Sequence, residues 1–138
     1  MNTQLIEQSW QSVAPYHHEI AETFYARLFE KHPEYKKMFS SENMPEQMDR
    51  MVRTLALVSS HADSPTAIRP HLHRLGEAHT RFGIGPDDFE AFSAVMIQVL
   101  GEYCRSVNGY WSDTCEQAWR DAFSSIVEPM MLEGMQTH

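Results

Sequence analysis

Apolar residues recur at intervals of three and four along most of the chain, which is the spacing of one face of an α-helix. The first such segment begins near Thr3, which we expect to cap it, and continues until Pro15. A second segment ends before Pro33, and a short one of a turn or two ends at Phe39. No alternating run lies between hairpin turns, so the pattern predicts an all-α fold of about six to eight packed helical segments.

The middle of the chain contains a helix, a loop and a further helix. Positions 48–58 carry apolar residues along one face. The stretch 59–70 holds two prolines and is the longest turn-like segment, so we expect a loop there. The next helical pattern spans 72–82, with His79 on its apolar face, and a Gly-Ile-Gly-Pro turn ends it.

Two further helices complete the pattern. Pro86 and the acidic pair that follows it open a helix that continues to the Asn-Gly dipeptide at 108–109. Ser112 is expected to cap the last helix, and Gly134 to end it.

Composition and charge narrow the class of protein. A length of 138 residues predicts one domain, residues 1–138. The net charge of -8 disfavours binding to nucleic acid or to an anionic membrane surface. The first residues lack a basic region, Glu7 interrupts the first apolar cluster, and no run of 18 apolar residues follows. We therefore expect a cytoplasmic protein.

The two cysteines, Cys104 and Cys115, form neither a C-x-x-C pair nor a C-x-x-C-H site for covalent haem attachment. Two buried thiols are the favoured interpretation, and a disulfide between antiparallel helices is the alternative.

The histidines do not have the spacing of a zinc site. His71 and His73 are two residues apart, about 200° around a helix, and His71 and His79 lie about 12 Å apart along its axis. Motifs of hydrolases, nucleotide-binding proteins and metalloproteases are also absent from the sequence.

His79 remains as a single ring on an apolar helix face. Taken alone, such a ring is more often a hydrogen-bonded core histidine than a ligand. Haem is the ligand that needs only one histidine from the protein, because the porphyrin brings four nitrogens of its own.

Three segments carry a family resemblance: FYARLFEKHPEYKKMF at 24–39, LGEAHTRFGIGPDDF at 75–89 and AWRDAFSSIVEPM at 118–130. They resemble the bacterial single-domain haemoglobins and the haem domain of flavohaemoglobins, both of the globin family. The resemblance implies a globin fold around a haem pocket and haem b, iron protoporphyrin IX, as cofactor.

The resemblance also implies roles for individual residues. His79 matches the proximal iron ligand, and the carbonyl of Leu75 one turn earlier would fix its tautomer. Phe39 matches the ring that packs against the haem face. Tyr25 matches the distal tyrosine, whose hydroxyl donates a hydrogen bond to bound dioxygen.

Further distal residues follow from aligning the chain with the single-domain haemoglobins, which requires a gap of two residues. Gln47 becomes the second distal polar residue and Met51 the apolar lid, whereas a misplaced gap would bring in Asp49 or Met48. Arg50 either pairs with a haem propionate or is a solvated surface residue. The remaining pocket-lining residues expected are Phe82, Phe89 and Phe92.

The sequence departs from flavohaemoglobins on the proximal side. Their tyrosine and glutamate partners of the proximal imidazole match Phe89 and Gly134, although Glu133 would compensate if the last helix shifted register. Without this acid, the imidazole has less anionic character and donates less electron density to the iron. This favours reversible binding over peroxide activation. Nitric oxide dioxygenation would need a separate reductase, because no flavin or nicotinamide domain is expected.

Three functions remain. The favoured one is a globin that binds dioxygen, and other diatomic gases such as NO and CO, for transport, storage or sensing. The second is a nitric oxide dioxygenase, and the third is a globin-fold interaction module without haem. A monomer or a homodimer is expected.

Overall fold

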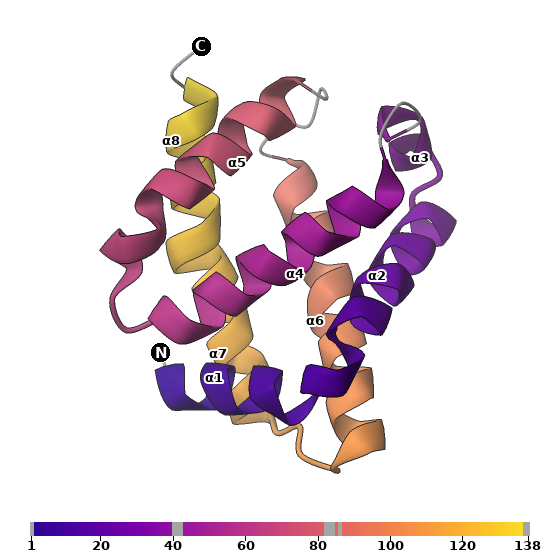
Figure 1. Ribbon diagram of the computed structural model, residues 1–138, viewed down its shortest axis with the longest axis vertical. Coiled ribbons are helices and arrows are strands. Elements are labelled where there is room, and N and C mark those ends of the chain that lie inside the picture. Colours follow the sequence, from indigo (N-terminus) through magenta and orange to yellow (C-terminus); the bar gives the residue numbers. More distant parts are fainter. Residues whose placement is uncertain (1, 40–42, 82–84, 86, 137–138) are drawn as a thin grey trace.

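The structure of the protein, a computed structural model, describes residues 2–39, 43–81, 85 and 87–136, with the side chains of 80, 81 and 136 left out. All regular elements of these residues are helical, which confirms the predicted all-α fold (Figure 1). The α-helices are α1 (Thr3–Ser12), α2 (His17–Lys31), α3 (Glu34–Met38), α4 (Met44–His61), α5 (Arg69–Arg81), α6 (Asp88–Val107), α7 (Asp113–Ala122) and α8 (Glu128–Gln136). Two short 3₁₀ segments, Ala14–Tyr16 and Pro65–Ile68, and one π-helical segment, Phe123–Val127, join them.

The helix starts follow capping chemistry. Ser112 caps α7 as predicted, since its hydroxyl oxygen accepts from the Cys115 N–H at 3.0 Å. The prediction that Thr3 caps α1 is wrong by one residue. Asn2 has the extended backbone of a cap, and its side-chain oxygen accepts from the Leu5 N–H at 3.2 Å, so Thr3 lies inside the helix.

The expected loop at 59–70 is largely helical. Helix α4 continues to His61, and a 3₁₀ turn then buries Ile68 before α5 begins at Arg69. The two prolines in this stretch mark helix starts: Pro65 opens the 3₁₀ turn and Pro70 lies in the first turn of α5. Proline is tolerated there because a first-turn N–H has no partner within the helix.

Gly134 does not end the last helix, contrary to the sequence prediction, because α8 continues to Gln136. A Cβ atom at Gly134 would lie 2.0 Å from the carbonyl oxygen of His73, and one at Gly76 would lie 2.1 Å from that of Met131. Helices α5 and α8, which lie side by side in Figure 1, therefore meet through their backbones. The glycine is needed for a close helix crossing and not for a stop.

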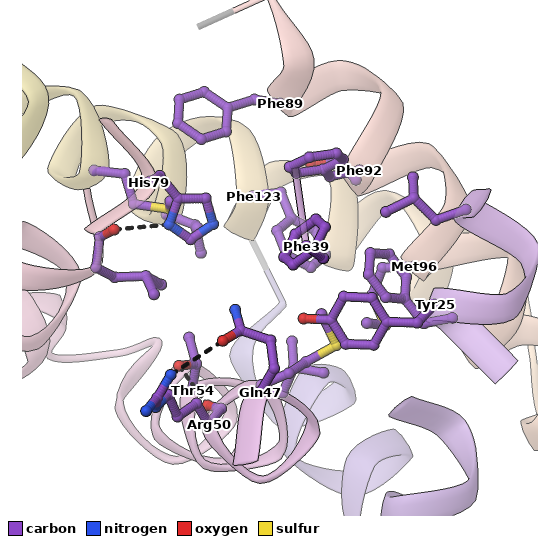
Figure 2. A pocket seen from close by; sticks show the side chains of 18 residues that line it. Tyr25, Phe39, Gln47, Arg50, Thr54, His79, Phe89, Phe92, Met96 and Phe123 are labelled. Atoms are coloured by element: carbon purple, nitrogen blue, oxygen red, sulfur yellow. Dashed lines mark hydrogen bonds between the residues drawn. The ribbon is translucent and has the colours of Figure 1, made fainter. Parts of the chain in front are cut away.

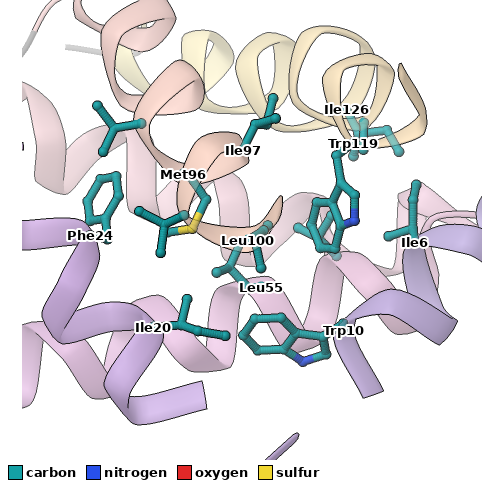
Figure 3. Close-up of a cluster of buried hydrophobic side chains, with 14 of the residues drawn as sticks. Ile6, Trp10, Ile20, Phe24, Leu55, Met96, Ile97, Leu100, Trp119 and Ile126 are labelled. Atoms are coloured by element: carbon teal, nitrogen blue, oxygen red, sulfur yellow. The ribbon is translucent and has the colours of Figure 1, made fainter. Parts of the chain in front are cut away.

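The core is built from apolar side chains of all the long helices, and Figure 3 shows Trp10, Ile20, Leu100 and Trp119 among them. The Trp119 indole N–H donates to the Ser9 hydroxyl at 2.8 Å, so this buried polar group is satisfied. Both cysteines are buried and free, in agreement with the favoured interpretation. Within the described residues, no helix has the length and apolar character needed to cross a membrane.

We expect Gly134→Ala and Gly76→Ala to lower the free energy of unfolding by about 1–3 kcal/mol each, because the added methyl group meets a backbone atom that cannot rotate away. Denaturant unfolding of each purified variant measures the loss.

Gly85→Ala is the matched control, since a Cβ there has no atom within 4 Å. Its free energy of unfolding should stay within about 0.5 kcal/mol of the parent. Equal stability of all three variants would show that α5 and α8 do not approach this closely.

Candidate functional site

A cavity of about 120 Å³ lies between helices α2, α4, α5 and α6 and the chain that leads into α8 (Figure 2). Nine of the ten residues singled out in the sequence line it. They are Tyr25, Phe39, Gln47, Arg50, Met51, Leu75, His79, Phe89 and Phe92. The tenth, Phe82, lies outside the described residues.

His79 projects into the cavity from α5, and its ring is fixed by the same helix. Its Nδ1 lies 2.7 Å from the carbonyl oxygen of Leu75, one turn earlier. A carbonyl oxygen can only accept, so Nδ1 carries the proton and Nε2 keeps its lone pair. Burial lowers the pKa of His79, and the bond to Leu75 opposes this only in part. The ring is therefore a neutral imidazole with an unprotonated Nε2.

The two other histidines of this helix have local partners. Nε2 of His71 lies 2.9 Å from the hydroxyl of Thr54, and His73 pairs with Glu77 at 3.1 Å. Among the residues described, no group of three or more histidine, cysteine, aspartate or glutamate side chains is placed to hold a metal ion.

Tyr25 and Gln47 form the wall across the cavity from His79 (Figure 2). Both are buried, with exposures of 4% and 8%. Burial raises the pKa of Tyr25 well above its usual range, while a hydrogen bond with Gln47 and the charge of Arg50 pull it down in part. The Tyr25 hydroxyl therefore stays protonated throughout the physiological pH range.

Near its start, helix α4 turns one polar side chain into the cavity. Asn43 caps this helix through the Glu46 N–H at 3.2 Å, and one turn later Gln47 faces the cavity. Asp49 is exposed, and Met48 lies in a surface groove instead. The geometry thus brings Gln47, and neither alternative, into the cavity that Tyr25 also lines.

Phe39 follows α3 and lies between aromatic neighbours. Its ring centroid is 5.7 Å from that of Tyr25, in an edge-to-face arrangement, and 5.6 Å from that of Phe29. On the α6 side, Phe92 packs edge-on against Tyr35, whose hydroxyl donates to Asp88 at 2.7 Å. These contacts hold flat apolar rings around the cavity.

Several lining residues were not identified in the sequence. Thr54 lies seven residues after Gln47 and shares its helix face, so helical spacing could have found it. Phe123, Val127 and Met131 recur every four residues along the π-helical segment and α8. The others are Phe24, Leu28, Leu55, Ser93 and Met96.

Glu133 does not replace the missing proximal acid. Its carboxylate pairs with Arg69 at 3.0 Å, on the half-exposed side of the α5–α8 crossing. The neighbouring Gly134 faces the backbone of α5 at His73. The register shift that would bring Glu133 to the imidazole is not present.

Comparison with known proteins gives related sequences over most of the chain. A flavohaemoprotein of Halalkalibacterium halodurans is 26% identical over 131 residues, which cover 91% of this chain but 30% of that protein. The chain therefore spans less than a third of this relative's length. An anaerobic nitrite reductase of Gossypium hirsutum is 25% identical over 143 residues, covering 94% of this chain and 86% of that protein.

Solved structures show the same fold. A bacterial globin from Campylobacter jejuni has a TM-score of 0.83 at 15% identity, covering 98% of this chain and 95% of that one. An engineered carbene transferase from Rhodothermus marinus has a TM-score of 0.84 at 21% identity, covering 98% and 92%.

The family assignment rests on a match to most of the chain. The model of the globin family matches residues 22–130, and these residues include the cavity walls on α2, α4, α5 and α6. The protein therefore belongs to the globin family, and this membership implies a haem cofactor.

Proposed function

We propose that this protein is a haem-binding globin that binds dioxygen reversibly. His79 is the proximal ligand, and Tyr25 and Gln47 are the distal hydrogen-bond donors. One observation carries the proposal: an unprotonated imidazole nitrogen lies on one wall of an apolar cavity, and two buried polar groups lie on the opposite wall.

The side chains of the cavity fit haem b. A single neutral imidazole suits a cofactor that brings its other nitrogens with it. The rings of Phe39, Phe89 and Phe92 provide apolar surface for a flat macrocycle. The chain has no C-x-x-C-H motif for thioether attachment of the porphyrin, which agrees with haem b.

When bound, haem supplies an iron atom whose open position takes a diatomic gas. The protein contributes the side chains on the two sides of the haem. Nε2 of His79 would hold the iron, and the carbonyl of Leu75 keeps the ring in the tautomer that can do so. The apolar side chains that line the rest of the cavity keep water away from the site. Hydrogen bonds made inside it are stronger for that reason.

The distal pair acts on the ligand. The Tyr25 hydroxyl keeps its proton because burial raises its pKa, so it is a donor. A hydrogen bond to a ligand with anionic character contributes about 1.5–3 kcal/mol. Donors of this strength slow the release of dioxygen, which carries partial negative charge, more than that of carbon monoxide.

Nitric oxide dioxygenation is a second candidate function. Flavohaemoproteins are among the relatives, and the Rhodothermus marinus neighbour carries the designation of a nitric oxide dioxygenase. The pairing of Glu133 with Arg69 leaves this glutamate away from the imidazole, which favours reversible binding. Sustained nitrate formation with an added reductase would favour the dioxygenase. A haem-free interaction module does not explain the open cavity in front of His79.

The protein reconstituted with haemin should show the ferric, ferrous and oxygenated absorption spectra of a histidine-ligated haem. His79→Gly should lose the coordination signature, and added imidazole should restore it by entering the vacated space. His73→Gly, in the same helix, controls for the cost of glycine there. An unchanged spectrum of H79G without imidazole would contradict the proposal.

Tyr25→Phe should raise the dissociation rate of dioxygen about tenfold or more, because one donor of about 1.5 kcal/mol is lost. Stopped-flow replacement of dioxygen by carbon monoxide measures this rate. Tyr103→Phe is the control, since that hydroxyl bonds Glu19 at 2.7 Å outside the cavity. Equal rates in Y25F and the parent would remove Tyr25 from the distal site.

Tyr25 should also make the apoprotein sensitive to alkali. The pKa of Tyr25 is raised in the folded state above the value of about 10 in the unfolded chain. The unfolded state therefore loses its proton first, and the free energy of unfolding falls as pH rises above about 10. Denaturant unfolding between pH 8 and 11 should show a shallower fall for Tyr25→Phe. An equally steep fall in the free energy of unfolding of Y25F and of the parent would contradict this role of Tyr25.

A further inference from the structure

Arg50 is bonded to the distal glutamine at the mouth of the cavity. Its Nη1 donates to Oε1 of Gln47 at 3.1 Å, and its Nη2 lies 3.5 Å from a carboxylate oxygen of Glu46. The Arg50 side chain is 50% exposed, whereas Gln47 is buried. A charged group at the rim therefore contacts a polar group inside.

This contact determines which way the amide of Gln47 points. A guanidinium has donors and no acceptor, so the amide atom that it contacts must be the oxygen. The NH₂ group then lies on the other side of the amide, toward the cavity (Figure 2). Without Arg50, a rotation of about 180° would exchange the two ends of the amide and place the carbonyl oxygen in the cavity.

The orientation of Gln47 also affects Tyr25. The amide end that faces the cavity carries only donors, so it offers the Tyr25 hydroxyl no acceptor, and its interaction with Tyr25 lowers the pKa of this residue. The proton of Tyr25 is then left for another acceptor in the cavity. The contacts run from Glu46 through Arg50 to Gln47, and Gln47 and Tyr25 line the same cavity.

We propose that Arg50 is a positioning residue that holds the Gln47 amide with its donors toward the cavity and thereby leaves the Tyr25 hydroxyl free to donate to a bound gas. This inference rests on the proposed function. The sequence offered a propionate or solvent as the partner of Arg50, and the contact with Gln47 adds a third role. It also makes Arg50 a determinant of selectivity, because a reversed amide would repel a ligand with anionic character and have little effect on carbon monoxide.

The test compares Arg50→Met with Arg53→Met in the haem-loaded protein. Arg53 is an exposed arginine three residues further along α4. Its substitution should change neither the dissociation rate of dioxygen nor the infrared band of the carbon monoxide form. Arg50→Met should raise the dissociation rate of dioxygen about tenfold, since a donor to an anionic ligand is lost or reversed. The infrared C–O stretching band of the carbon monoxide form should move to higher frequency or split, because a donor near the ligand lowers this frequency.

The same measurements in a Gln47→Leu background complete a double-mutant cycle. If Arg50 acts through the amide, Arg50→Met should have no further effect on the rate or the band once Gln47 is gone. An unchanged band and rate in R50M would overturn the inference, and so would an effect of equal size with and without Gln47. Failure of the parent protein to take up haem would instead overturn the proposed function.

Discussion

The site depends on one hydrogen bond between a ring and a carbonyl of its own helix. His79 and Leu75 are four residues apart, so the helix itself brings the carbonyl oxygen under Nδ1. This bond selects the tautomer, and the tautomer decides whether the cavity receives a lone pair or an N–H. Burial acts in the same direction, because it keeps the ring neutral. The Leu75 side chain has no part in this, although the residue itself lines the cavity.

The opposite wall depends on the rotational phase of one helix. The Asn43 cap marks where α4 begins, and the phase of the helix places Gln47 inside, Arg50 at the rim and Asp49 in solvent. The α4 residues that line the cavity share one helical face, since each residue adds about 100°. Distal chemistry in this protein is therefore decided by which face of α4 is buried as well as by residue type.

Helical spacing and capping residues predicted most of the elements, because both act over a few neighbouring residues. Ser112 is an example, since its cap bond is made three residues away. Gly134 could not be interpreted in this way: a glycine that ends a helix and a glycine that crosses another helix look the same in a sequence, and the distinction lies in His73, 61 residues earlier. The orientation of the Gln47 amide is likewise a property of a contact, which residue type alone does not specify.

The crossing of α5 and α8 has a consequence for the proximal side. At Gly76 and Gly134 the two backbones meet without an intervening side chain, so there is no rotatable group between them to absorb a displacement. Gly76 lies three residues before His79 in the same helix. A sliding or tilting of the C-terminal helix would therefore be passed to the imidazole as a rigid-body movement, and the position of that ring is set by two helices together.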